Sequence, residues 1–162
     1  MNIFVLDTDH VRCAEYHTDR HSVKMILEVA QMLSTAHREL DPEDTIDPIV
    51  YKKAHLNHPC TIWTRKTKGN YLWLFQMFKS LSEEYTYRYG KIHSSWTKLG
   101  SILVNEPKNI DPSSEVTEFA LAMPDEYKVR GDAVTSYRNY YNGAKRHLFS
   151  WKNREVPYWV KI

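Results

Sequence analysis

The stretch HSVKMILEVAQMLSTAH, residues 21–37, decides the fold, because it predicts a helix that is apolar around most of its circumference. Its polar side chains recur every three or four residues and form one stripe: His21, Lys24, Glu28, Gln31 and Thr35. At about 100° per residue, this stripe covers an arc of roughly 80°. Polar groups on so apolar a helix are costly to bury unless they pair or face a wet cavity, so we predict that the stripe lines a pocket.

Proline, glycine and capping residues divide the rest of the chain into further helices. Pro59 suits the first turn of a helix, Gly90 suits a C-cap and Asp132 suits an N-cap. The predicted helices cover residues 21–39, 59–67, 70–89, 92–104 and 133–148. The segments predicted to be non-helical are an extended arm (2–6), irregular stretches (7–20, 41–58 and 105–118) and an aromatic tail (151–162). We therefore expect a mostly α fold, with residues 1–162 forming a single compact helical domain.

The composition is that of a globular protein of 162 residues, with 42% apolar and 26% charged residues. No segment approaches the roughly 18 apolar residues of a membrane span, and the start of the chain lacks the basic region of a signal peptide. Cys13 and Cys60 form neither a metal-binding pattern nor a disulfide framework. We expect a cytoplasmic protein with no metal, no cofactor and no membrane partner.

Charge and aromatic content bear on the ligand. A formal net charge of +2 is low for a dedicated duplex-DNA binder and leaves room for a small anionic ligand. Eleven tyrosines and five tryptophans exceed what a core of this size needs. The surplus rings are equally consistent with a ligand surface and with a contact between copies of the chain in a homo-oligomer.

The stripe on residues 21–37 supplies the first candidate chemistry. Glu28 is a candidate general base or ribose-binding group, His21 a candidate proton carrier, and Lys24 and Gln31 are candidate ligand-binding groups. The alternative is that Lys24 and Glu28, four residues apart, form an ordinary exposed ion pair worth a few tenths of a kcal/mol.

A second cluster, residues 53–59, reads Lys-Ala-His-Leu-Asn-His-Pro and precedes the helix that Pro59 begins. A helix N-terminus attracts anions, so Asn57 and His58 are candidate ligand-binding residues and His55 a candidate catalytic proton carrier. A capping or loop role is the alternative. No acidic or cysteine partner stands at zinc-ligand spacing.

Two further clusters interleave cations with aromatic rings, a mixture that can hold phosphate and stack a base. Arg88 and Lys91 lie at the end of the predicted helix 70–89. Tyr137, Arg138 and Tyr141 lie on the last predicted helix. We take all five as candidate ligand-binding residues, against the alternative of a basic helix end and an amphipathic helix packed on the body of the protein.

Four motifs follow one another in an order that resembles small phage-type proteins of the pyrimidine-dimer DNA glycosylase family. They are Arg20-His21-Ser22-Val23-Lys24 entering the first long helix, Asn57-His58-Pro59, Pro124-Asp125-Glu126-Tyr127 and Pro157-Tyr158-Trp159 near the end. The resemblance covers most of the chain. It implies the helical fold of that family and, for a phage-encoded protein, location in the host cytoplasm.

The family resemblance also implies a chemistry. In that family an N-terminal threonine supplies an amine that forms a Schiff base at the sugar C1′, assisted by a glutamate on the first helix that is flanked by arginines. Here Asn2 follows Met1, and the bulk of Asn2 hinders removal of the methionine. His21 takes the place of the family glutamate, and Glu28 is the nearest acid on the same helix face.

Three functions therefore stand as hypotheses, the first being cleavage of an N-glycosidic bond in a base or nucleotide, by a glycosylase or nucleotide hydrolase. The groups assigned to that reaction are Glu28 or Asp7 to activate water, His21 and His55 to move protons, and Lys24 and Arg88 to hold phosphate. The second hypothesis is a non-catalytic phage protein that sequesters a host nucleotide immune signal. The third is a DNA-binding accessory factor, whose affinity would depend steeply on salt.

Overall fold

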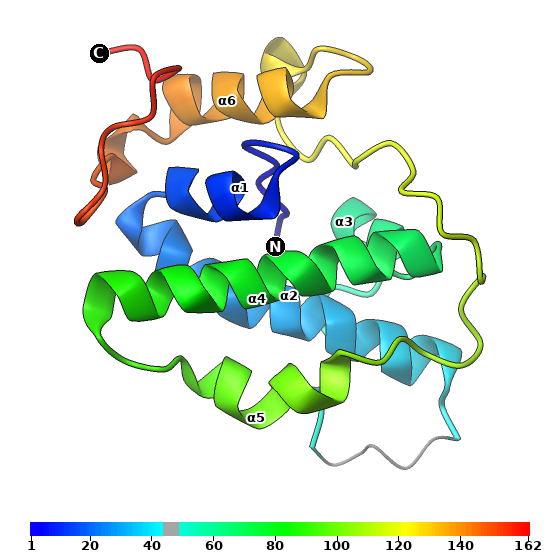
Figure 1. Cartoon of the computed structure of the whole chain (residues 1–162). Helices are drawn as coiled ribbons and strands as arrows, with labels where there is room; N and C mark the ends of the chain where they lie inside the picture. The colour runs from blue at the N-terminus through cyan, green and yellow to red at the C-terminus, as the bar shows by residue number, and fades with distance from the viewer. Residues whose placement is uncertain (44–48) are drawn as a thin grey trace.

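The computed structural model describes residues 1–43 and 49–162, and their regular structure is entirely helical (Figure 1). The helices are α1 (His10–Tyr16), α2 (Asp19–Leu40), α3 (Pro59–Thr64), α4 (Lys68–Tyr89), α5 (Ser94–Leu103) and α6 (Ala133–Ala144), with 3-10 turns η1 (Asp125–Tyr127) and η2 (Arg146–Leu148). The mostly α prediction is confirmed. Within the described ranges, no helix is long and apolar enough to cross a membrane.

The two longest helices, α2 and α4, pack against each other and form the centre of the core. They run antiparallel, because His37 near the end of α2 contacts Tyr71 at the start of α4, whereas Asp19 at the start of α2 pairs with Arg88 at the end of α4. α1 packs on α4, α5 packs on both long helices, and α3 packs on α2 (Figure 1). The predicted helices 59–67, 70–89, 92–104 and 133–148 are each present with ends shifted by a few residues.

One helix was not expected. Residues 7–20 were predicted to be irregular, but α1 forms within them, capped by the Asp9 side chain, which accepts a hydrogen bond from the Arg12 N–H. A seven-residue helix has too few turns to show a clear period, and its stability comes from burying Cys13 and Ala14 against the rest of the core.

The N-terminal arm runs through the interior. Ile3, Phe4, Val5 and Leu6 are all buried. The C-terminal part of the chain, with α6, lies at the end of the molecule opposite α5 (Figure 1). The Arg138 side chain on α6 donates to the Leu6 carbonyl at 2.9 Å and so ties the C-terminal part to the arm.

The polar stripe of α2 does not share one environment, so it does not form a single pocket wall. His21 and Thr35 are buried, Lys24 is exposed, and Glu28 and Gln31 are partly buried. In addition, the apolar residues Val23 and Leu27 are 38% and 41% exposed, so part of the apolar surface of α2 also faces solvent. The stripe ranges from core to surface because α2 is covered by different elements along its length.

Candidate active site

The N-terminal amine and Glu28 form an ion pair at the middle of α2. The Met1 nitrogen lies 2.9 Å from Glu28 Oε1. The Met1 side chain is 2% exposed and packs against the core, and the Glu28 side chain is 13% exposed. A carboxylate is thus held against the one nucleophilic amine that a backbone can supply.

The neighbouring residue, Asn2, is fixed by four contacts. Its Nδ2 donates to the Ala122 carbonyl at 2.9 Å, and its Oδ1 accepts from the Ile3 N–H at 2.8 Å. The Tyr137 hydroxyl, at 3.0 Å, and the Cys60 thiol, at 3.5 Å, also face Oδ1. Asn2 is therefore bound to the start of α3, to the segment before η1 and to α6, and these contacts set where the amine can lie.

His58 stands at the start of α3, next to this pair. Its Nδ1 accepts a hydrogen bond from the Cys60 N–H at 3.0 Å, so the ring proton of the neutral form is on Nε2. Burial lowers the pKa of His58, and the positive N-terminal amine and His55 lower it further, while Glu28 opposes them. The N-terminal amine, His55 and Glu28 therefore each act electrostatically on His58.

His55 has an unusual backbone for a residue that carries a side chain. It is exposed in the loop before α3, with φ at 48°, in the left-handed region that costs energy for most residues. The loop thus holds a strained conformation beside His58. The predicted catalytic role of His55 stays a prediction, as do the predicted ligand roles of Asn57, which is exposed, and of His58.

Taken together, the cluster offers a nucleophile, a proton acceptor and a proton donor. A neutral amine attacks electrophilic carbon, a carboxylate accepts the proton that the amine loses, and an imidazole Nε2–H can donate to a leaving group. Within residues 1–43 and 49–162, no three His, Cys, Asp or Glu side chains are grouped so that they could hold a metal ion.

His21, predicted to carry protons, lies in the core instead. Its ring stacks on Phe4 at 4.3 Å between centroids, and its Nδ1 lies 2.6 Å from the Tyr141 hydroxyl. Burial, helped by the neighbouring His17, lowers the pKa of His21 to about 3. The ring is therefore neutral at neutral pH, and the predicted catalytic role of His21 stays a prediction.

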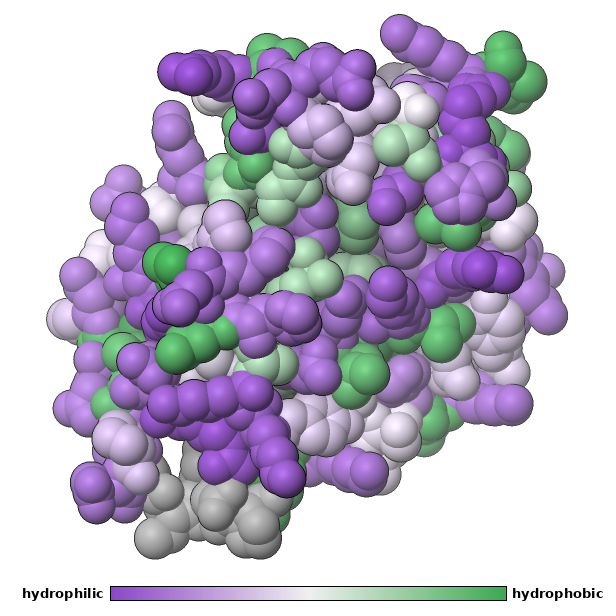
Figure 2. All heavy atoms as spheres, turned by 180° about the vertical axis from the view of Figure 1, so that it is seen from behind, coloured by the Kyte–Doolittle hydropathy of each residue, from purple (hydrophilic) through white to green (hydrophobic). Residues whose placement is uncertain are grey.

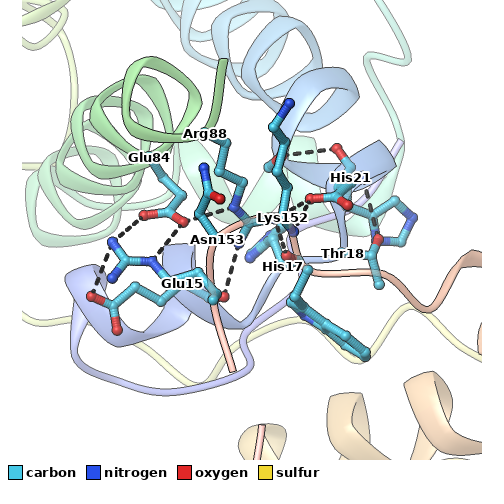
Figure 3. A network of polar contacts seen from close by, with 12 residues as sticks. Glu15, His17, Thr18, His21, Glu84, Arg88, Lys152 and Asn153 are labelled. Carbon is cyan, nitrogen blue, oxygen red and sulfur yellow. Dashed lines mark hydrogen bonds and ion pairs between the residues drawn. The ribbon is translucent and has the colours of Figure 1, made fainter. Parts of the chain in front are cut away.

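Arg88, predicted to bind phosphate, is at the centre of a buried polar network (Figure 3). Its side chain is fully buried, and Nε donates to Glu84 Oε2 at 2.7 Å. Its terminal nitrogens donate to Asp19 Oδ1 and to the carbonyls of His17 and Glu15. Through these contacts Arg88 holds α1, α2 and α4 together, and its predicted ligand role stays a prediction.

The two predicted tyrosines of α6 are also structural. Tyr137 and Tyr141 are fully buried, so neither ring can stack on a base. Arg138 is only partly buried, but its guanidinium is engaged: NH2 lies 3.3 Å from Asp7 Oδ2 and NH1 donates to the Tyr158 hydroxyl. Asp7, predicted as an alternative to Glu28, is thus paired with a cation.

The remaining predicted ligand residues stay predictions. Lys24 and Gln31 lie one turn before and after Glu28 on α2, exposed and partly buried respectively, so they flank the ion pair. α2 lies behind α4 in Figure 1, and the reverse view in Figure 2 shows a mainly hydrophilic face with small apolar patches. Lys91 is exposed in the connection that follows α4.

Residue patterns alone did not single out the amine. No periodicity or motif marks Met1, and only the family resemblance drew attention to the N-terminus. The available signal is the apolar run over residues 3–6, which predicts that the start of the chain is held inside the protein.

Comparison with known families identifies a related family. Residues 1–98 match the family model described as pyrimidine dimer DNA glycosylase. The matched residues include Met1, Glu28 and His58 and end within α5, before the segment that leads to α6. No curated protein and no solved structure gives a match.

Proposed function

Since the chain belongs to the pyrimidine dimer DNA glycosylase family, we propose that it cleaves the N-glycosidic bond of a damaged base in DNA with the α-amine of Met1 as nucleophile. The observation that carries this proposal is the 2.9 Å contact between the Met1 nitrogen and Glu28 Oε1. The family membership gives a glycosylase-like activity on DNA at a coarse level. The assignment of the Met1 amine as nucleophile goes beyond family membership and is the proposal made here.

The proposed reaction needs only groups at this site. The amine passes a proton to Glu28, and its nitrogen attacks C1′ of the damaged nucleotide. The C1′–N bond breaks, and the base leaves with the bonding electron pair and takes up a proton. The sugar ring then opens at the C1′–O4′ bond, O4′ is protonated, and a C=N bond to the Met1 nitrogen remains as a Schiff base.

Neighbouring groups supply the other requirements of this reaction. Glu28 is only 13% exposed, so its charge is weakly screened. Once Glu28 has passed the proton on to the leaving base, its restored carboxylate stabilises the positive charge of the protonated Schiff base. His58 Nε2–H is the proposed donor to the leaving base or to a phosphate oxygen, because Nδ1 is already engaged by the Cys60 N–H. Lys24 and Gln31 on either side of Glu28 are the proposed contacts to the DNA backbone.

The decisive experiment is reductive trapping. The protein is incubated with a duplex that carries one cyclobutane pyrimidine dimer, and separately with a duplex that carries an abasic site, in the presence of borohydride. We expect a covalent adduct that peptide mass spectrometry places on the nitrogen of Met1, and no adduct with undamaged duplex. An adduct on a lysine side chain, an adduct on Asn2 after loss of Met1, or base release without any adduct would contradict this mechanism.

A further inference from the structure

The segment that follows the family match contacts the residue next to the amine. We infer that Tyr137 on α6 is a positioning residue, which holds the Met1 amine against Glu28 by fixing the Asn2 carboxamide. This inference rests on the proposed function. It makes α6 part of the catalytic apparatus although the family model ends at residue 98.

The Asn2 carboxamide has one orientation that satisfies its surroundings. Both the Ile3 N–H and the Cys60 thiol are donors and face Oδ1, while the Ala122 carbonyl is an acceptor and faces Nδ2. The Tyr137 hydroxyl lies 3.0 Å from the same Oδ1. Reversing the amide would put donors against donors in a buried place, so the side chain is locked.

The Tyr137 hydroxyl also connects Asn2 to the segment before η1. Its oxygen lies 2.7 Å from the Ala120 carbonyl and accepts from the Ala122 N–H at 3.3 Å. Because Ala122 in turn accepts from Asn2 Nδ2, the hydroxyl and the carboxamide are held to the same stretch of backbone. Loss of the hydroxyl would therefore remove one contact of Asn2 Oδ1 and would also release the Ala120–Ala122 backbone, to which Asn2 Nδ2 is bound.

The amine has an anchor on each side. The Met1 side chain packs in the core, and the Asn2 side chain is locked one peptide unit away. Because both side chains are held, few backbone rotations can move the Met1 nitrogen. Misplacing a reacting group by about 1 Å can lower a rate by roughly 100-fold, so a small release of Asn2 is expected to show in kcat.

Tyr141 provides a matched control. It lies one helical turn after Tyr137 on α6, and it is equally buried. Its hydroxyl faces the Thr18 N–H at 3.4 Å and His21 Nδ1 at 2.6 Å instead of Asn2. Replacing either tyrosine by phenylalanine removes one buried hydroxyl, but only Tyr137→Phe removes a contact to Asn2, the residue next to the amine.

The test compares Tyr137→Phe with Tyr141→Phe on the duplex that carries a pyrimidine dimer. We expect Tyr137→Phe to lower kcat for C1′–N bond cleavage about 10- to 100-fold with KM within about twofold, and to slow trapping on Met1 by the same factor. Tyr141→Phe should keep kcat within about twofold. Thermal unfolding of both variants should show similar losses, which separates positioning from a general loss of stability.

Two further measurements strengthen the test. Asn2→Leu keeps the bulk at position 2 and so keeps Met1, and the double variant Asn2→Leu with Tyr137→Phe should be no slower than Asn2→Leu alone. Mass spectrometry can also follow the rate at which a reagent acylates the Met1 amine, in the absence of substrate. This rate should change in Tyr137→Phe and stay the same in Tyr141→Phe.

The outcomes distinguish this inference from the proposed function. A wild-type protein that traps on Met1, together with equal kcat values for the two tyrosine variants, would overturn the role of Tyr137 and leave the proposed function standing. A wild-type protein that forms no adduct with either damaged duplex would overturn both.

Discussion

Acid should destabilise this protein through two buried histidines, His17 and His21. Burial lowers the pKa of His17 to about 4 and that of His21 to about 3, from an ordinary value of 6.5. His17 Nδ1 lies 2.6 Å from the Cys13 carbonyl, an acceptor, so this nitrogen already bears the proton and a second proton must enter at Nε2 inside the core. Both rings are therefore neutral when folded.

The sign follows from which state binds protons. Above pH 6.5 both histidines are neutral in the folded and the unfolded chain, so their contribution to stability is fully present. As the pH falls below 6.5, the two histidines bind protons in the unfolded chain but not in the folded chain. The free energy of unfolding therefore decreases toward the folded-state pKa values. At about pH 5 each histidine lowers the free energy of unfolding by roughly 2 kcal/mol, and the pair lowers it by roughly 4 kcal/mol.

Urea unfolding followed by circular dichroism between about pH 7.5 and 5 measures this loss. His21→Gln should lower stability at neutral pH, because it removes the stack on Phe4, but it should lose about 2 kcal/mol less than wild type across the acid range. His147→Gln alters an exposed histidine and should follow the wild-type profile. Equal pH profiles for wild type and His21→Gln, or ring protons of His17 and His21 that titrate near pH 6.5 in the NMR spectrum, would refute the reasoning.

Three further predictions concern single side chains. Glu28→Gln should lower the rate of base release by about 100-fold or more in single-turnover assays, whereas Glu39→Gln, at an exposed pair on the same helix, should leave the rate unchanged. Gly69→Ala should destabilise the protein by about 1–3 kcal/mol in urea unfolding despite the better helix propensity of alanine, because its Cβ would lie 2.4 Å from two backbone carbonyl oxygens; unchanged stability would show that this segment yields. Arg88→Met should cost about 3–5 kcal/mol, since it leaves the buried Glu84 with only the partly exposed Arg154 as a cationic partner, and a smaller loss measured by the same unfolding assay would mean that the network rearranges.

Much of the helical framework follows from local sequence. The apolar period of residues 21–37, Pro59 at the start of α3 and Gly90 at the end of α4 all act through the backbone within a few residues, so their effects are visible without a tertiary structure. The order of the motifs also indicated the family. Glu28 was named as a catalytic candidate from the same pattern.

Local sequence patterns do not show which groups the polar side chains contact in the folded protein. Periodicity shows that His21, Lys24 and Glu28 share a face of α2, but the first is covered by Phe4, the second is exposed and the third meets the N-terminus. Arg88 illustrates the same limit. A cation among aromatic residues at a helix end predicts a ligand site equally well whether its donors face water or, as in Arg88, two carbonyl and two carboxylate groups of the protein itself.

The sequence by itself determined most of the helical segments, because helix formation depends largely on residues within a turn or two of one another, whereas α1 depends on tertiary burial. Only the tertiary structure decided which groups form the site. The Met1 amine, Glu28, His58 and Tyr137 come from the arm, α2, the start of α3 and α6, and their proximity results from packing of the core. No local pattern encodes such distances, since they depend on how the apolar faces of separate helices fill space together.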